Sequence, residues 1–328
     1  MSVILTKPDF GASSLQMAPT SSAKTTRYVV ISPVRNEAEH LEQTIRSVVE
    51  QTVRPLCWLI VNDGSTDQTR EIIERWAARY PWIVPVHRSD LDRQRSSGGD
   101  VRESKADRGK RARAAKEIEA FYAGYEHLPY HDWEFLVKLD GDLSFDSDYF
   151  ERCFEEFFAD TALGIAGGAI CHLVDGEFEV EPSPRFHVRG ATKIYRRACW
   201  EQIGGVLPAA GWDTVDEVKS NLLGWSTRTL NGLNVLHYRF TGAANGAWDN
   251  AVKNGVWSYI AGYHPLFLLG RCAKQLFKKP ALLGSVGLLF GYLSGWLEAV
   301  PRIEDPSVIR YLRDQQLRRL SLRPSIWK

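Results

Sequence analysis

Short apolar runs alternate with amphipathic stretches through the first half of the chain. Residues 28–32, 57–61 and 82–86 are rich in β-branched and other apolar residues, which is typical of buried strands. Between the first two runs, residues 41–49 place apolar side chains at helical spacing. Asn36 is predicted to cap this helix, with a glutamate three residues later completing a capping box. The alternation predicts an α/β fold of the Rossmann-like kind, with a mainly parallel sheet and helices on both faces.

The same alternation continues to about residue 240. Helical patterns cover residues 114–125 and 148–158. Further strands are predicted at residues 134–139, 164–174, 177–181, 193–196 and 227–240. The first 26 residues are rich in Ser, Thr and Ala and predict a disordered tail. We therefore expect a tail at 1–26, an α/β domain at 27–240 and a helical region at 241–328.

The C-terminal region has a different pattern. Residues 280–297 contain no charged residue, a length at the lower limit for a membrane-spanning helix. Three glycines four residues apart, Gly287, Gly291 and Gly295, give one smooth helical face. Four basic residues lie before this helix and suit anionic head groups: Arg271, Lys274, Lys278 and Lys279. We predict contact with a membrane surface, through interfacial helices or a short hairpin. A buried helical cap or a homodimer face is the alternative.

Composition narrows the classes of function. The chain has 41 Lys and Arg against 40 Asp and Glu, a net charge of +1, which argues against a nucleic-acid partner held by a basic surface. Its five cysteines lie far apart and form no CxxC pair. This spacing suits reduced thiols in the cytoplasm and gives no support to a zinc cluster or a disulfide framework.

Acidic residues follow two of the predicted strands directly. Asp140 and Asp142 come after residues 134–139, and Asp63 comes after the second strand. In open α/β sheets, ligands bind at the carboxyl ends of the strands. Two carboxylates separated by one glycine can bind Mg²⁺ or Mn²⁺, whereas Asp63 can accept hydrogen bonds from ribose hydroxyls or a base N–H. The alternative is that all three residues serve only as turn formers.

Three motifs in this order resemble those of family 2 glycosyltransferases with the GT-A fold. They are YVVISPVRNE at residues 28–37, NDGSTD at 62–67 and KLDGD at 138–142. The resemblance covers residues 27–240 and implies a nucleotide-sugar half at 27–142 and an acceptor half at 143–240. It further implies a nucleotide-diphosphate sugar donor (a UDP- or GDP-sugar), a divalent metal ion (Mg²⁺ or Mn²⁺) and inversion at the anomeric carbon.

The resemblance assigns roles to the residues of these motifs. Pro33, Arg35 and Glu37 line the nucleotide pocket, and Asp63 contacts the base or ribose. Asp140 and Asp142 then lie at the ribose, the metal ion and the diphosphate.

Two further segments carry weaker matches. Family members often have a Gly-Lys pair before the helix that precedes the metal strand, and here Lys110 is the candidate contact for donor phosphates. Related enzymes also place a histidine or basic group near the metal ion or diphosphate at the end of a later strand. The candidates are His237 as a metal ligand and Arg239, two residues on, as a donor contact.

The family also carries an acidic dyad before a helix that ends in glycine. Counting back from Gly224 puts Asp213 on the aspartate of the dyad, with Trp212 in place of its glutamate. This departure leaves Asp213, Asp216 and Glu217 open as the general base, with Asp213 and Asp216 as our catalytic candidates. The alternative for each acid is that it only favours the positive end of a helix.

The resemblance therefore implies a hexosyltransferase-type enzyme, acting on a glycan or polyprenyl-linked acceptor at the cytoplasmic, inner face of a membrane. Two other interpretations stay open. One is a non-catalytic nucleotide-sugar-binding scaffold of an envelope-polymer assembly. The other is a sugar-phosphate nucleotidyltransferase, which would be expected to carry a glycine-rich loop where this chain reads Pro-Val-Arg-Asn-Glu.

Overall fold

The computed structural model describes residues 26–88, 112–174, 176–208, 211–239, 246–277 and 281–327. Its strands are β1 (Tyr28–Val34), β2 (Cys57–Asn62), β3 (Ile83–His87), β4 (Phe135–Leu139), β5 (Leu143–Phe145), β6 (Leu163–Val174), β7 (Glu177–Val180), β8 (Thr192–Arg196) and β9 (Ser226–His237). The helices of the α/β part are α1 (Leu41–Val49), α2 (Thr69–Ala77), α4 (Ala112–Glu126), α5 (Tyr149–Ala159), α6 (Arg197–Ile203) and α7 (Trp212–Leu222). They are followed by α8 (Gly246–Ile260), α9 (Pro265–Gln275), α10 (Ala281–Leu297) and α11 (Pro306–Leu320). The tail predicted for residues 1–26 lies outside this part of the chain except for Thr26.

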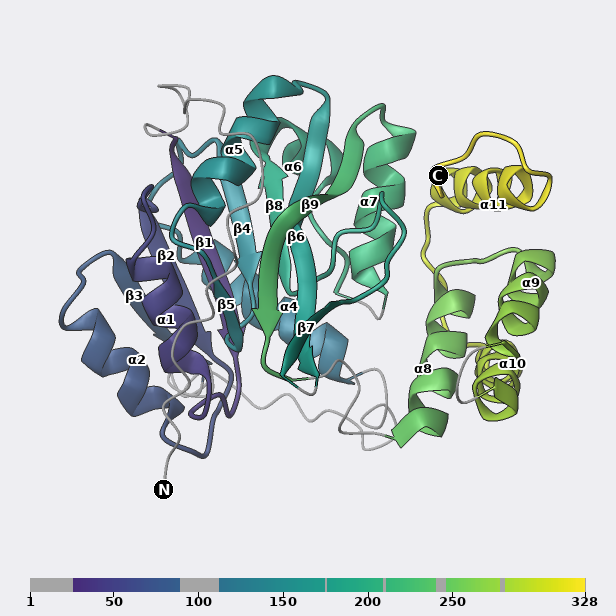
Figure 1. The fold of residues 1–328 in the computed structure, drawn as a ribbon, viewed down its shortest axis with the longest axis horizontal. Helices are drawn as coiled ribbons and strands as arrows, with labels where there is room; N and C mark the ends of the chain where they lie inside the picture. The colour runs from purple at the N-terminus through teal and green to yellow at the C-terminus, as the bar shows by residue number, and fades with distance from the viewer. Residues whose placement is uncertain are drawn as a thin grey trace, which may run out of the picture.

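The strands form one sheet in the order β3-β2-β1-β4-β8-β6-β9-β5, and β7 pairs with β6 (Figure 1). β1 to β4, β6 and β9 run in one direction, whereas β5, β7 and β8 run in the other. The predicted α/β class with a mainly parallel sheet is therefore confirmed.

Helices cover both faces of the sheet. Successive side chains of a strand point to opposite faces. Tyr28 and Val30 of β1 accordingly join a buried core with α1, α2 and α5. Val29 and Ile31 join a second core with α4 and α6. The strand is buried on both sides, which explains why it reads as a continuous apolar run.

The first helix covers the predicted residues, but its predicted capping box is wrong. α1 begins at Leu41, its N-cap is His40, and no side chain caps it. Asn36 lies at φ 54°, in the left-handed region, and its side-chain oxygen accepts a hydrogen bond from the Thr66 N–H. The chain makes a turn between Asn36 and the helix, so Asn36 does not fill the N-cap position.

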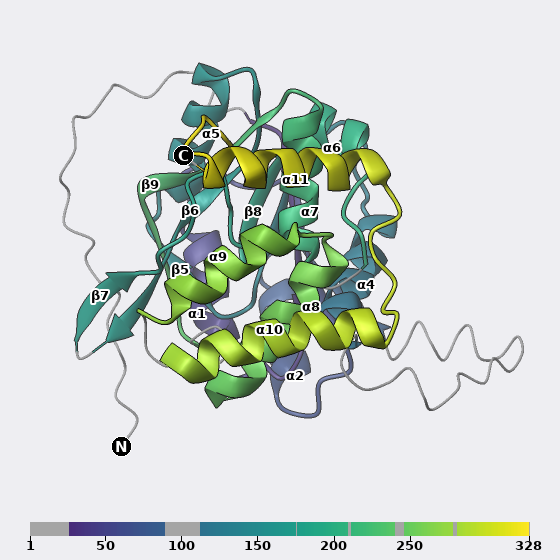
Figure 2. The same ribbon diagram turned by 90° about the vertical axis from the view of Figure 1, so that its right-hand side faces the viewer.

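The described residues from 246 onwards form only helices. α8, α9 and α10 pack around Tyr259, Leu268, Leu288 and Tyr292. α11 packs against α7, and α8 to α11 lie together on the side of the molecule that carries α7 (Figures 1 and 2). Among the described helices, none is long and apolar enough to cross a bilayer.

Candidate active site

The carboxyl ends of four strands meet at one edge of the sheet. In β1 and β2 the last residues, Val34 and Asn62, are paired in parallel register. β9 reaches the same edge because the Tyr238 N–H donates to the Asp142 carbonyl just after β4, at 3.0 Å. This is the lower edge of the sheet in Figure 1, where β1 and β9 end. The strand-end residues predicted from the sequence therefore gather at one place.

Asp140, Asp142 and His237 offer ligand atoms within 4.8 Å of one another. His237 Nε2 lies 3.2 Å from Asp142 Oδ2, and His237 Nδ1 is buried without a hydrogen-bond partner. Carboxylate oxygens suit Mg²⁺ and Mn²⁺, and an imidazole nitrogen is a frequent ligand of transition metals. The three residues predicted as metal ligands therefore form a donor set that fits a divalent cation.

Basic side chains surround these carboxylates. Arg239 Nε donates to Asp142 at 2.9 Å, and the same guanidinium pairs with Glu37. Lys138 pairs with Asp140. Burial raises the pKa of Asp140. Burial also raises the pKa of Asp142, but hydrogen bonds from His237 and Arg239 outweigh it and lower the pKa below its ordinary value. A bound divalent cation would favour the ionised form of both carboxylates.

Asp63 lies just beyond β2 with two arginines beside it. Arg88 donates to Asp63 Oδ1 at 2.6 Å, and Arg35 lies 4.0 Å from Asp63 Oδ2. The Asp63 N–H donates to the Val34 carbonyl at 2.9 Å, which ties it to the end of β1. Pro33, within β1, is half-buried. Asp63 thus lies at the same edge of the sheet as Asp140, Asp142 and His237, which we call the metal-type cluster.

Polar residues of the NDGSTD segment, together with Thr69 at the start of α2, support the loop after β1. The backbone N–H groups of residues 36–38 donate to Ser65 Oγ at 3.0 Å, Thr69 Oγ1 at 2.8 Å and Asp67 Oδ2 at 3.0 Å. These bonds hold the loop against the start of α2. Asp63 differs from them because its described side-chain partners are both arginines.

Asp213 lies in the first turn of α7 with a partly exposed side chain. Its carboxylate is 4.0 Å from His187 Nε2, and Lys193 Nζ donates to its backbone carbonyl at 2.5 Å. Burial raises the pKa of Asp213, but the positive charges of His187 and Lys193 outweigh it and lower the pKa below its ordinary value. The group is therefore an accessible carboxylate at neutral pH.

The other two acids of α7 are buried and fully bonded. Asp216 accepts hydrogen bonds from Lys193 at 2.9 Å and from the Tyr195 hydroxyl at 2.5 Å. Glu217 accepts one from the Val188 N–H at 2.7 Å. Burial and these bonds favour Asp213 over Asp216 and Glu217 as the base, because its carboxylate is the more exposed of the three. A catalytic role for Asp216 stays a prediction.

Trp212 links the two groups of charged residues. The Nζ atoms of Lys138 and Lys193 each lie 5.3 Å from the centroid of its ring. An aromatic face attracts cations, so a tryptophan suits a position between two ammonium groups. Through these lysines the ring connects Asp140 on one side with Asp213 on the other.

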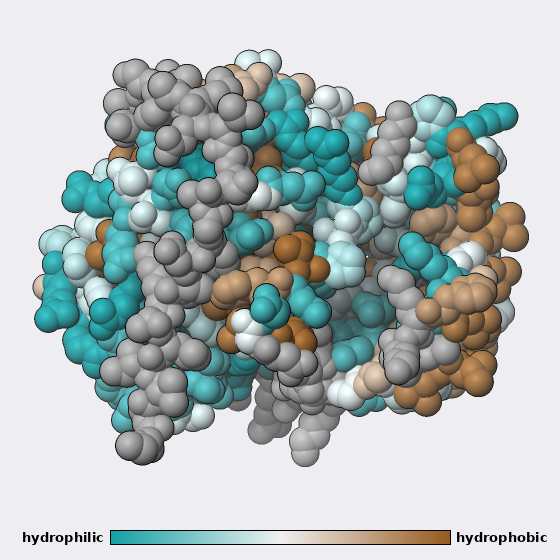
Figure 3. All heavy atoms as spheres, viewed as in Figure 1, coloured by the Kyte–Doolittle hydropathy of each residue, from teal (hydrophilic) through white to brown (hydrophobic). Residues whose placement is uncertain are grey.

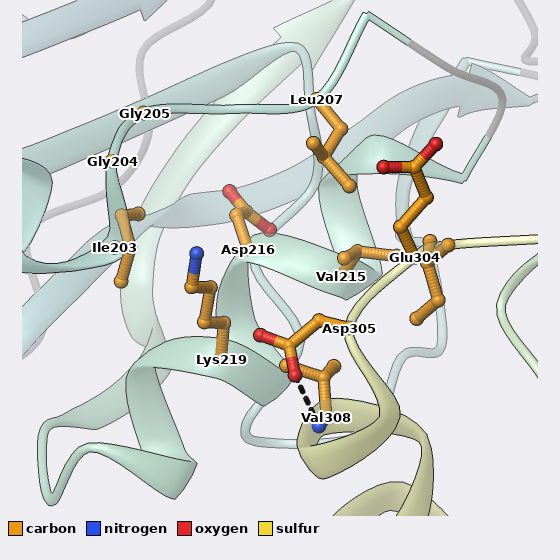
Figure 4. Close-up of a pocket in the computed structure, with 11 residues that line it drawn as sticks. Ile203, Gly204, Gly205, Leu207, Val215, Asp216, Lys219, Glu304, Asp305 and Val308 are labelled. Carbon is orange, nitrogen blue, oxygen red and sulfur yellow. Dashed lines mark hydrogen bonds between the residues drawn. The ribbon is translucent and has the colours of Figure 1, made fainter.

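A pocket of about 200 Å³ lies elsewhere, between α7 and the segment that leads into α11 (Figure 4). Among the predicted site residues, only Asp216 lines it. Asp305 at its edge accepts a hydrogen bond from the Val308 N–H, as the cap of α11. The pocket is thus separate from the metal-type cluster.

The motifs assign no role to two lysines of this site. Lys138 and Lys193 are almost fully buried within β4 and β8. Each lysine lies inside an otherwise apolar strand, and this pattern could have identified it, since a buried ammonium group needs an acidic partner. Lys110, the predicted phosphate contact, lies outside the described residues.

Comparisons with known proteins agree on one family for part of the chain. Residues 29–96 match the family model Glycosyl transferase family 2. An uncharacterized glycosyltransferase of Escherichia coli (strain K12), YibD, is 28% identical over 133 residues. That match covers 40% of this chain and 36% of YibD, so the chain spans little more than a third of the length of this relative. The resemblance inferred from the motifs is confirmed for residues 29–96.

Two solved structures illustrate the structural likeness. The mannosyltransferase PcManGT from Pyrobaculum calidifontis, solved with GDP-Man and Mn²⁺, is 16% identical, with a TM-score of 0.49 over 95% of this chain and 80% of that one. Residues 1–349 of TarS from S. aureus are 13% identical, with a TM-score of 0.48 over 84% of this chain and 73% of that one.

Proposed function

We propose, from the match of residues 29–96 to the model of glycosyl transferase family 2, that this protein is an inverting, metal-dependent glycosyltransferase of the GT-A type. It moves a sugar from a UDP- or GDP-sugar to a hydroxyl of a glycan or polyprenyl-linked acceptor. One observation carries the proposal. Asp140 and Asp142 just after β4 and His237 at the end of β9 bring their ligand atoms within 4.8 Å of one another.

The donor binds at the edge where β1, β2 and β4 end. Asp140, Asp142 and His237 would hold Mg²⁺ or Mn²⁺, which would offset negative charge on the leaving diphosphate. Arg35 and Arg239 both have half-exposed side chains, which leaves them able to reach an anionic donor. The remaining donor contacts that we propose are Pro33, Glu37, Asp63 and Lys110.

Asp213 acts as the general base. Its carboxylate takes the proton of the acceptor hydroxyl while the acceptor oxygen bonds to the anomeric carbon, and the bond from that carbon to the diphosphate oxygen breaks. Attack from the face opposite the leaving group inverts the configuration. His187 and Lys193 support this role because they keep Asp213 ionised. Proton transfer of this kind is worth about 100- to 10,000-fold in rate.

We propose a separate role for each of three segments of the chain. Residues 27–142 form the nucleotide-sugar half. Residues 143–240 form the acceptor half and also supply His237 and Arg239 to the donor side, and residues 241–328 hold the enzyme at the cytoplasmic, inner face of a membrane. The acceptor half contains Asp213, and the donor half contains Asp63, Asp140 and Asp142.

Incubation with UDP- and GDP-sugars, with and without Mn²⁺, tests the proposal. We expect release of the nucleoside diphosphate from one class of donor, only when Mn²⁺ or Mg²⁺ is present. Donor binding without any release, even with candidate acceptors, would favour the non-catalytic scaffold. Formation of pyrophosphate from a nucleoside triphosphate and a sugar phosphate would favour a nucleotidyltransferase. Either result would overturn the proposal.

A further inference from the structure

The glycines of α10 face the protein. A Cβ atom on Gly291 would lie 2.0 Å from the Val252 carbonyl oxygen of α8, and one on Gly287 would lie 2.7 Å from Ala251 Cβ. A Cβ on Gly295 would meet the Tyr259 ring at 2.9 Å. The smooth face predicted from the sequence is therefore used for close packing against α8.

The large apolar side chains of α10 consequently face outward. Seven of them are at least 45% exposed: Leu282, Leu283, Val286, Phe290, Leu293, Trp296 and Leu297. In a helix of a water-soluble domain, the large apolar residues form the stripe that packs on the core. Helices that contact lipid show the opposite arrangement: their small residues face the neighbouring helix and their large apolar residues face outward.

The exposed apolar surface extends beyond α10. Leu266 and Leu269 of α9 are 56% and 52% exposed, and Phe277 just after α9 is 90% exposed. Figure 2 shows α9, α10 and α11 lying across one face of the molecule, and Figure 3 shows hydrophobic residues gathered on that side. We call this surface the α9–α11 face. A contiguous patch of this kind marks an interaction surface, since single exposed apolar residues are scattered on most proteins.

Positive charge accompanies this face. Residues 265–328 contain eleven Lys and Arg against four Asp and Glu, a net charge of +7. The whole chain carries +1, so the preceding residues carry −6. Four arginines of α11 and the turn after it have exposed side chains: Arg310, Arg318, Arg319 and Arg323. Basic residues beside an apolar surface are attracted to anionic lipid head groups.

We propose that the α9–α11 face docks on the surface of an anionic lipid bilayer, with α10 lying in the plane of the interface. α10 has 17 residues and is about 25 Å long, shorter than the hydrocarbon core of about 30 Å. It therefore lies along the membrane rather than across it. Charge also distinguishes this occupant from a second copy of the chain, because two such faces would bring their arginines together. The inference deepens the membrane contact proposed above for residues 241–328 and does not depend on the proposed sugar transfer.

Sedimentation with vesicles tests the proposal on the full chain. We expect binding to vesicles of phosphatidylglycerol and phosphatidylcholine in equal parts, weaker binding to phosphatidylcholine alone, and loss of binding as salt screens the charges. The variant Leu282→Ser/Phe290→Ser/Trp296→Ser should bind about tenfold or more weakly. Leu173→Ser/Val180→Ser, which changes exposed apolar residues of the β6–β7 hairpin, is the matched control and should bind like the native chain.

Circular dichroism and urea unfolding check that both variants are folded. A native chain that stays in the supernatant with anionic vesicles overturns the proposal. So does a chain that is a dimer without lipid and becomes a monomer in the triple variant, while vesicle binding is unchanged, since the face would then join two copies. Release of nucleoside diphosphate is measured separately without vesicles, so failure of docking and failure of the proposed reaction are told apart.

Discussion

Asp213 differs from the other acids of α7 in what its carboxylate touches. Asp216 and Glu217 are buried and bonded to neighbouring donors, whereas the Asp213 side chain is 24% exposed, with its closest described ion-pair partner 4.0 Å away. Lys193 bonds to its backbone carbonyl rather than to its carboxylate. The side chain therefore keeps oxygens available for a proton from outside the protein.

The variant Asp213→Asn should keep donor binding and lose transfer by about 100- to 10,000-fold, because the amide cannot accept the acceptor proton. Initial rates of nucleoside diphosphate release with acceptor would measure the loss, and titration of the nucleoside diphosphate would measure binding. Asp132→Asn, an exposed aspartate next to the opposite end of β4, is the control. Near-native turnover in Asp213→Asn would refute the assignment.

At the residue scale, candidate site residues could be predicted from the sequence where they follow the end of a predicted strand. The proximity of Asp140, Asp142 and His237 followed from the DxD segment and from a histidine at the end of a late strand. The buried network around Lys193 could not be predicted, because its partners are 20 or more positions away in sequence. Their meeting depends on how α7 packs on β8, which no local pattern specifies.

At the scale of elements, buried ion pairs connect α7 to strand β8 of the sheet. Lys193 points from β8 to Asp216 and Glu217 of α7, at 2.9 Å from each, and all three side chains are buried. Breaking a buried ion pair by removing one partner leaves an uncompensated charge in a medium of low polarity. The Lys193 ammonium group is therefore a central contact that positions α7, and with it Asp213, beside the bonds from Tyr195 and His187.

Lys193→Met should lower the free energy of unfolding by about 3–5 kcal/mol, since it removes the ammonium group that pairs with both buried carboxylates and leaves Glu217 with His187 and Asp216 with the Tyr195 hydroxyl. Urea unfolding followed by circular dichroism would measure the change. Lys116→Met, which removes an exposed lysine of α4, should stay within about 0.5 kcal/mol of the native chain. A loss below about 1 kcal/mol in Lys193→Met would mean that the network does not hold α7.

Periodicity predicted most elements but not their order in the sheet. The alternation of strands and helices in residues 28–139 was readable because each element there spans several repeats of its pattern. β5 has three residues and α6 has seven, too few for either period to appear. The antiparallel strand β8 lies between β4 and β6. Its place in the sheet depends on tertiary packing and cannot be predicted from the pattern of any single segment.

At the scale of the whole molecule, the candidate site joins distant parts of the chain. Arg239 bridges Glu37 and Asp142, and Glu37 and Arg239 are 202 positions apart. The site therefore exists only when both halves of the sheet are folded together. A ligand that binds this site binds the native state and not the unfolded chain, so it must stabilise the entire fold.

A thermal-unfolding screen of nucleoside diphosphates with Mn²⁺ should accordingly raise the melting temperature for one base. Ligand at 100 times its dissociation constant adds about 2.7 kcal/mol, which corresponds to several degrees for a chain of this size. Asp142→Asn should lose the part of this shift that requires Mn²⁺, because one of the three candidate ligands is gone. Asp314→Asn, an exposed aspartate of α11, should keep the full shift. The same Mn²⁺-dependent shift in Asp142→Asn would place the metal ion away from Asp142, and a flat response to every nucleoside diphosphate would remove the donor site itself.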